Sequence, residues 1–198
     1  MSPEIKQMSK KDEIISASIE IFVNEGFDRP TMDSIASRAG VSKRTLYKYF
    51  PNKHALLDDI LIQLVDEKQS GLNFKYSKEE DILIQVQGII KHKTDHILCP
   101  SNLKLAKIIL SEALKGEGFL KDMLEEVLKT EKVTLEWIQH AQDDGKLSKE
   151  EEPLIVLDFL NELVNGIIFF PILFGKKDNV TDKEIEDVAK MFLFLKGV

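Results

Sequence analysis

Cysteine is almost absent from this chain of 198 residues, since Cys99 is its single example. The count excludes an internal disulfide and suits a reducing cytoplasm. The longer apolar stretches are broken by Asp, Glu or Asn, so we expect no membrane-spanning segment. The N-terminal stretch MSPEIKQMSKK lacks the apolar core of a signal peptide. These features together predict a cytoplasmic protein.

Motifs of common enzyme chemistry are also missing. We find no nucleophile elbow, phosphate-binding glycine loop or metalloprotease motif. No strand pattern, internal repeat or low-complexity tract competes with helices separated by short breaks. With 43% hydrophobic and 31% charged residues, the composition is that of a soluble globular protein. The sequence predicts an all-α protein that is not an enzyme and carries no cofactor.

Arginine is scarce and unevenly placed, because all three arginines lie within the first 44 residues. Residues 1–55 hold 9 Lys and Arg against 7 Asp and Glu, whereas residues 56–198 hold 18 against 27. Between residues 31 and 53 there are five cations and one acid, Asp33. The net charge of −7 therefore hides a basic N-terminal portion. Such asymmetry suggests a part that binds nucleic acid.

The first fifty residues carry the start and stop signals of three helices. Ser9, with Asp12 three residues on, resembles a capping box, and Gly26 is placed to end that helix. Thr31 and Ser42 are N-cap candidates for two further short helices. Two short helices joined by a tight turn that contains glycine are typical of a helix-turn-helix.

The rest of the chain predicts a larger helical body. Asn52 is the N-cap candidate of a helix of about residues 53–70 that links the two parts. The other predicted helices cover about residues 78–98, 102–115, 118–143, 151–174 and 182–196. We therefore predict a DNA-binding domain at residues 1–55 and an all-helical ligand-binding and dimerisation domain at residues 56–198.

Residues 42–50 have two different faces on a helical wheel. Leu46 and Phe50 face the other head helices, four residues apart. The opposite side and its flanks carry three cations, two phenols and one hydroxyl, from Lys43, Arg44, Thr45, Tyr47, Lys48 and Tyr49. Such a face can hydrogen-bond phosphates and base edges together.

Three of the cations stand where a helix prefers acids. Lys43 and Arg44 lie in the first turn of one predicted helix, and Lys53 begins the next. The helix dipole makes each of these positions mildly unfavourable. The repulsion turns into attraction when a phosphate enters, which favours a DNA ligand. The alternative is that the long side chains reach water at trivial cost.

Residues 14–57, IISASIEIFVNEGFDRPTMDSIASRAGVSKRTLYKYFPNKHALL, closely resemble the N-terminal DNA-binding domain of TetR-family transcriptional regulators. The most specific stretch is GVSKRTLYKYFPNKHALL, with its glycine, cap, Thr-Leu-Tyr, aromatic-Phe and downstream lysine. The resemblance implies a homodimer that binds palindromic operator DNA, mostly as a repressor. It also implies a divergent helical body whose small-molecule ligand releases the DNA.

The resemblance further implies roles for individual head residues. Positions that usually touch phosphates are matched by Thr31, Ser42, Tyr47, Tyr49 and Lys53. Positions that usually approach bases are matched by Lys43, Arg44 and Thr45. Lys48 joins the predicted DNA-binding set through its place on the exposed helix face.

The last two predicted helices have apolar faces wider than the single stripe of an ordinary surface helix, so they need cover from two directions. The family commonly pairs these helices in a four-helix bundle between subunits, so we expect a homodimer. The predicted interface residues are Ile168, Ile172, Val188, Met191, Phe192 and Leu195. Two well-buried core helices in a monomer are the alternative.

A polar stripe interrupts the penultimate helix, where Asp158, Asn161, Glu162 and Asn165 lie at i, i+3, i+4 and i+7. It can face solvent, the dimer interface or a ligand pocket, where a few polar groups orient an apolar ligand. The predicted ligand-binding residues are Phe119, Trp137, Phe159, Glu162, Asn165 and Phe169. The aromatic members serve equally well as core, and any effector would be small and mostly apolar.

His92, His96 and Cys99 also share one helix face, at i, i+4 and i+7, and could hold zinc. A structural zinc site needs a fourth ligand, and none stands nearby in sequence, so no metal is predicted.

Two other functions compete with a DNA-binding regulator. One is a helical small-molecule-binding protein or an enzyme that uses His140 or the Asp158 and Glu162 pair. The other is a module whose basic head binds an acidic protein or membrane surface.

Overall fold

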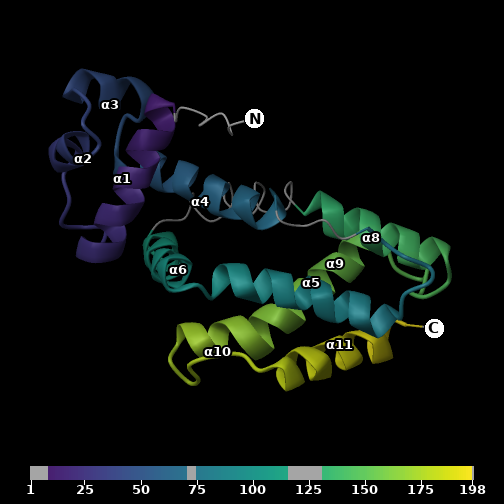
Figure 1. Cartoon of the computed structure of the whole chain (residues 1–198). Coiled ribbons are helices and arrows are strands. Elements are labelled where there is room, and N and C mark those ends of the chain that lie inside the picture. Colours follow the sequence, from purple (N-terminus) through teal and green to yellow (C-terminus); the bar gives the residue numbers. More distant parts are fainter. Residues whose placement is uncertain (1–8, 71–74, 116–130, 198) are drawn as a thin grey trace, which may run out of the picture. The chain divides into compact units, whose positions relative to one another are not determined.

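The computed structural model describes residues 9–70, 75–115 and 131–197. Every element named in that part of the chain is a helix, as Figure 1 shows. The β-type pairing found there is an isolated bridge between Leu147 and Gly197. The predicted all-α class is therefore confirmed.

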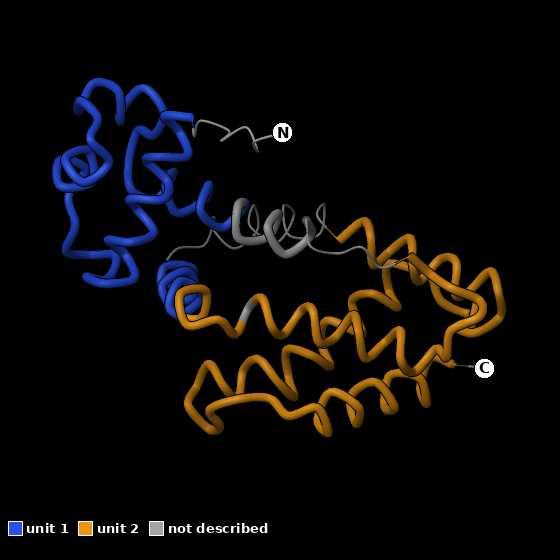
Figure 2. The backbone as a smooth tube through the Cα atoms, viewed as in Figure 1, with its two compact units in different colours: residues 1–64, 104–124 blue, residues 65–103, 125–198 orange. Residues whose placement is uncertain are grey.

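Packing divides the chain into two compact units (Figure 2). Residues 1–64 and 104–124 form the first, which we call the head unit, and residues 65–103 and 125–198 form the body unit. Helix α4, Lys53–Ser70, begins in the head unit and ends in the body unit. The predicted domain boundary after residue 55 stays a prediction, because this division follows packing alone.

Three short helices open the head unit. They are α1, Lys10–Glu25, α2, Met32–Arg38, and α3, Lys43–Tyr49. Each begins at a predicted N-cap, because the side chains of Ser9, Thr31 and Ser42 accept a hydrogen bond from the backbone N–H three residues on. The starts of these helices therefore follow from N-cap residues that can be identified in the sequence.

The head core forms where these helices meet. Phe22, Ile35, Leu46 and Phe50 are buried. The rings of Phe22 and Phe27 lie 5.1 Å apart at a tilt of 57°, which is a favourable aromatic arrangement. The core fixes the rotation of α3 about its own axis, and this decides which side chains of α3 point outward.

The body unit contains most of the remaining helices. They are α5, Ile82–Ile97, α8, Lys132–Asp143, α9, Pro153–Val164, the π-helix η1, Asn165–Phe169, α10, Phe170–Leu173, and α11, Asp182–Lys196. Helix α5 packs along α11, and α8 packs against α9 (Figure 1). Trp137, Leu157, Ile168 and Phe192 are among the residues of their shared core.

Two predicted helix starts need correction. The helix expected from about residue 78 begins at Ile82, because the side chain of Asp81 caps it by accepting from the Leu83 N–H at 2.7 Å. The helix expected from about residue 102 is α6, Pro100–Ala113. Pro100 is its first residue, a position where the missing N–H costs nothing. The helix expected at 118–143 lies partly outside the described residues.

The helix predicted for residues 151–174 contains a wide turn. The Phe170 N–H donates to the Asn165 carbonyl, five residues back, which defines the π-helix η1. Pro171 follows at once. It has no N–H, and its ring would press on the carbonyl of residue 167 in a regular α-helix. One wide turn placed just before the proline relieves this conflict and lets the rod continue.

The same rod bears on our expectation that no segment of the chain spans a membrane. Pro153–Leu173 is long and apolar enough to cross a membrane by length and composition, with a mean hydropathy of 1.7. The core helix of a soluble protein also meets these criteria of length and composition. In this protein the inner side of α9 supplies Val156, Leu157 and Leu160 to the body core.

The loop that follows α4 is fastened to α8 and α5. The Tyr76 hydroxyl donates to Asp144 Oδ2 at 2.7 Å, and Lys78 Nζ lies 2.6 Å from Asp144 Oδ1. The Tyr76 ring meets Trp137 edge-on, with centroids 5.9 Å apart. The buried Gln85 side chain donates to the Ser77 carbonyl and accepts from the Ser77 N–H. We call Tyr76, Lys78 and Asp144 the loop clasp.

Candidate functional site

The turn between α2 and α3 is tight and well defined. Gly40 has a φ of 64°, a left-handed conformation that suits glycine. The Val41 N–H donates back to the Ala36 carbonyl at 3.0 Å. Ser42 then caps α3 through the Thr45 N–H at 3.1 Å. This geometry is the helix-turn-helix that the sequence predicts.

Helix α3 presents the predicted polar face to solvent. Leu46 and Phe50 are buried, as expected from the wheel. The exposed residues of the predicted DNA-binding set are Thr31, Ser42, Lys43, Arg44, Tyr47, Lys48 and Tyr49, and Thr45 is half-buried. A surface rich in cations, phenols and hydroxyls therefore stands on one side of the head unit.

The side chains on this surface are held to different degrees. Ser42 Oγ and Thr45 Oγ1 lie 2.8 Å apart and share a hydrogen bond. Lys48 Nζ lies 6.0 Å from the centre of the Tyr49 ring. Arg44 has no ion-pair partner among the described residues. Its guanidinium is therefore the cation of α3 most available to a ligand.

Lys43 is paired, which the sequence did not indicate. Its Nζ lies 2.5 Å from Asp33 Oδ2 at the start of α2. In the sequence, Asp33 stands in the first turn of its helix, where an acid favours the helix N-terminus. The available signal was its position as the one acid between residues 31 and 53.

Lys53 already has partners inside the head unit. Its Nζ donates to the carbonyls of Phe27 at 2.7 Å and Asp28 at 3.0 Å. The same ammonium lies 4.8 Å from the centre of the Phe27 ring. Lys53 therefore ties the start of α4 to the turn after α1. Its predicted phosphate contact stays a prediction.

The predicted dimer residues separate into two groups. Ile168, Ile172, Val188 and Phe192 are buried within this chain, so their side chains offer no surface to a second subunit. Met191 and Leu195 are exposed. We define the outer apolar set as the exposed apolar residues of α9 to α11, which are Leu154, Ile155, Ile167, Phe170, Phe174, Met191, Phe194 and Leu195.

The predicted ligand-binding residues that the structure describes have different environments. Trp137 is buried and donates to Gln85 Oε1 at 3.1 Å. Phe159 stacks on Phe192 with centroids 6.4 Å apart. Glu162 is exposed, whereas Asn165 and Phe169 are half-buried in η1. Phe119 lies outside the described residues.

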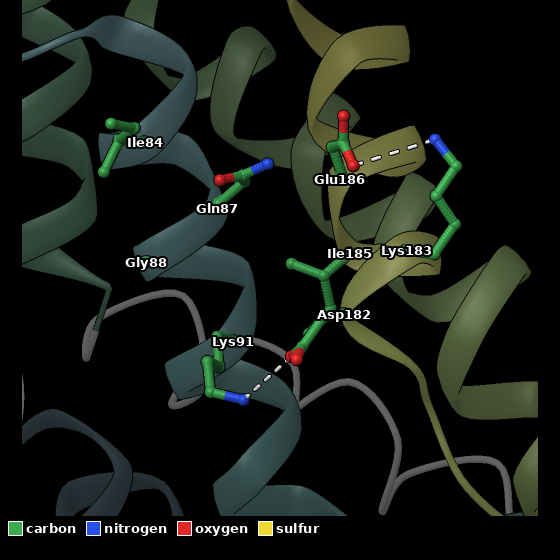
Figure 3. A pocket seen from close by; sticks show the side chains of 8 residues that line it. All are labelled: Ile84, Gln87, Gly88, Lys91, Asp182, Lys183, Ile185 and Glu186. Carbon is green, nitrogen blue, oxygen red and sulfur yellow. Dashed lines mark hydrogen bonds and ion pairs between the residues drawn. The ribbon is translucent and has the colours of Figure 1, made fainter.

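One surface hollow of about 480 Å³ lies between α5 and α11 (Figure 3). Lys91 points to Asp182 at 3.3 Å, and Lys183 lies 3.7 Å from Glu186. A charged rim of this kind does not suit the mostly apolar effector that we expect.

The polar stripe of α9 points in more than one direction. Asp158 and Glu162 are exposed, so these two residues lie on the surface of this chain and do not line a pocket inside it. Asn161 turns inward, and its Oδ1 accepts from Lys93 Nζ at 3.0 Å.

Lys93 belongs to a buried charged cluster. Its Nζ lies 2.5 Å from Glu131 Oε2, and both side chains are only 3% exposed. Thr134 Oγ1, one turn along α8 from Glu131, is buried without a hydrogen-bond partner among the described residues. The sequence carried one signal for Lys93, since it falls on the apolar face of α5 at i+7 from Val86.

His92, His96 and Cys99 are not brought together as a set of three metal ligands. In the described part of the chain, no group of three His, Cys, Asp or Glu side chains is placed to hold a metal ion.

Comparison with known proteins agrees with this architecture over nearly the whole chain. Residues 14–60 match the family described as bacterial regulatory proteins, tetR family. Residues 85–194 match the C-terminal domain of AefR-like transcriptional repressors.

Individual relatives are also regulators. The uncharacterised HTH-type transcriptional regulator YdeS of Bacillus subtilis is 28% identical over 187 residues, which cover 89% of this chain and 84% of YdeS. A TetR-family regulator from Mesorhizobium loti has a TM-score of 0.77 at 22% identity, with 96% of this chain and 97% of that one covered. The flavonoid-responsive regulator FrrA has a TM-score of 0.70 at 24% identity, with 95% and 97% covered.

The enzyme alternative falls away, because the matching families and these relatives are transcriptional regulators. A DNA-binding head with an exposed α3, joined to a helical body that matches a repressor domain, places this chain in the TetR family of transcriptional regulators.

Proposed function

We propose that this protein is a cytoplasmic repressor that binds palindromic operator DNA as a homodimer and is released by a small, largely apolar effector. The observation that carries the proposal is the exposed face of α3. Its outward side presents Arg44, Tyr47 and Lys48, while Leu46 and Phe50 fix its rotation from within. In helix-turn-helix proteins this helix enters the major groove.

We infer the division of labour on this face from the state of each side chain. Arg44 is the best candidate to read a base. Its guanidinium has no ion-pair partner among the described residues, so it can donate two hydrogen bonds to guanine. Thr31, Ser42, Tyr47, Tyr49 and Lys48 are suited to phosphate contacts, which position a protein on DNA without reading sequence.

The outer apolar set supports a dimer. Phe194 is 87% exposed and Phe174 is 66% exposed. We propose that these residues form one apolar patch, a feature that marks interaction surfaces in soluble proteins. A second copy of the same chain is the occupant that also gives two heads to a palindrome. Met191 and Leu195 keep their predicted interface role, and the four buried candidates are replaced by the outer apolar set.

The proposed effector would meet polar groups inside the body unit. Its support is the buried cluster of Lys93, Glu131 and Asn161, together with the unpartnered Thr134 hydroxyl. Polar groups inside an apolar body can orient a mostly apolar ligand. The name of FrrA shows that one regulator with this fold responds to flavonoids.

A mobility-shift assay tests the DNA-binding role. The wild-type chain should shift the DNA upstream of its own gene, and added salt should weaken the complex steeply. Arg44→Ala should lose discrimination at one or two base pairs, by about 1–3 kcal/mol for each bidentate contact. Glu25→Ala, at an exposed position at the end of α1, is the control. If Arg44→Ala and wild type behave alike, α3 does not read the operator.

A further inference from the structure

The ion pair of Lys43 and Asp33 joins the two helices of the helix-turn-helix on the DNA-facing side. Lys43 is the first residue of α3, and Asp33 lies in the first turn of α2. Their charged atoms are 2.5 Å apart, and the side chains are 66% and 55% exposed. The pair is therefore both formed and accessible beside Arg44.

The stability of the fold does not explain why an acid stands at position 33. Exposed ion pairs contribute little to folding, because water screens both charges. Asp33 also works against binding to the DNA backbone. Its carboxylate repels phosphates, and it neutralises the charge of Lys43, which could otherwise pair with a phosphate. A role in reading sequence fits the acid better, because base edges present hydrogen-bond donors whereas phosphates do not.

The chemistry of the pair matches one base pair well. A G·C pair shows two acceptors in the major groove, N7 and O6 of guanine, next to one donor, N4 of cytosine. A lysine ammonium donates to guanine, and an aspartate accepts from cytosine N4. In the head, the donor of Lys43 and the acceptor of Asp33 stand side by side in the same way.

We propose that Lys43 and Asp33 act as one reading unit that selects a G·C pair in each half-site. This inference rests on the DNA-binding role of the head. Asp33 supplies the acceptor for cytosine, and it holds Lys43 over the bases instead of letting it swing to a phosphate. Removal of Asp33 should cost specificity and at the same time increase non-specific affinity.

Selection from a pool of random-sequence duplexes by the full-length chain tests this proposal. Wild type should select sites with one G·C position that Asp33→Ala no longer selects, with discrimination there falling by about 5- to 100-fold. The freed Lys43 should bind one more phosphate, so the log–log salt dependence on non-specific duplex should steepen by about 0.9. Asp33→Asn should move the preference at the same position toward A·T, because an amide pairs well with adenine.

Glu20→Ala is the matched control, because Glu20 pairs with Arg38 at 3.1 Å on the same head unit. It removes the same charge and frees a cation, but it should leave the selected sequence unchanged. Non-specific binding and an unchanged melting temperature show that each variant is folded. Identical selected sequences for wild type and Asp33→Ala would overturn the reading unit alone. Selection of no sequence by wild type would overturn the DNA-binding function and the reading unit with it.

Discussion

At the scale of single residues, Lys53 shows how one cation can have a structural role inside a basic surface. The sequence places it at a helix start, next to a cap, where the family usually touches phosphate. In the structure, its ammonium donates to the carbonyls of Phe27 and Asp28. Those carbonyls belong to the turn that follows α1. Lys53 therefore stabilises the head whether or not DNA is bound.

We expect Lys53→Ala to lower the free energy of unfolding of the protein by about 1–2 kcal/mol, because two carbonyls lose a charged donor. Chemical denaturation without DNA measures the change. Lys48→Ala is the control, since Lys48 is exposed and contacts only the Tyr49 ring in the described part of the chain. Equal stability of the two variants would show that the carbonyl contacts contribute nothing.

Lys93 and Glu131, unlike the cations of the head surface, form a charged pair that is buried. Removing one partner from a buried pair leaves the other uncompensated, which costs about 3–5 kcal/mol. We therefore expect Glu131→Ala to be strongly destabilising in chemical denaturation. The double variant Lys93→Met with Glu131→Leu should be clearly more stable than Glu131→Ala, because it removes both charges of the buried pair together. A double variant as unstable as the single one would contradict this account.

At the scale of elements, the loop clasp fixes the loop after α4 to the end of α8. Burial and the hydrogen bond to Asp144 raise the pKa of Tyr76 to about 12. Hydrogen bonds from Lys78 and Tyr76 lower the pKa of Asp144. The folded clasp thus keeps the phenol protonated and the carboxyl ionised, so two elements far apart in sequence are joined at one carboxylate.

The clasp predicts a loss of stability in alkali. A tyrosine whose pKa rises on folding stabilises the protein below its unfolded pKa of about 10, and this contribution is lost as the pH rises toward the folded value. Tyr76→Phe should be less stable than wild type by about 1 kcal/mol near neutral pH. The difference should shrink above about pH 10, as measured by denaturation across the pH range. Tyr49→Phe, at an exposed position on α3, should show neither effect.

At the scale of the whole molecule, the outer apolar set is the feature that a monomer leaves unexplained. It follows α9 to α11, the same helices that supply much of the body core. These helices carry apolar residues on their outward as well as their inward sides, and this lets Pro153–Leu173 also meet the composition of a membrane helix. A second copy of the chain is the cover that we propose for the outward side.

We expect Phe194→Asp to weaken the dimer, because it places a charge where an apolar contact would form. Analytical ultracentrifugation should show a shift toward monomer, and operator affinity should fall with it. Ile84→Asp is the control, since Ile84 is also exposed, at 56%, but lies on α5. If both variants have the same mass in solution as wild type, α11 does not form the interface.

The sequence by itself determined what depends on local signals. Ser9, Thr31 and Ser42 cap their helices as predicted, because a cap and its helix lie within a few residues of each other. The outward face of α3 followed from the spacing of Leu46 and Phe50. These local rules, with the stretch GVSKRTLYKYFPNKHALL, were enough to indicate the family and its DNA-binding head.

Tertiary structure alone decided which of several equivalent residues meets which partner. Sequence spacing could not separate Phe192, which is buried, from Phe194, which is exposed, because both lie in the uninterrupted apolar run MFLFL at residues 191–195. Nor could it pair Lys43 with Asp33, Lys53 with the carbonyls after α1, or Lys93 with Glu131. Such contacts join residues ten or more positions apart, so they exist only after packing has fixed the rotation and position of each helix.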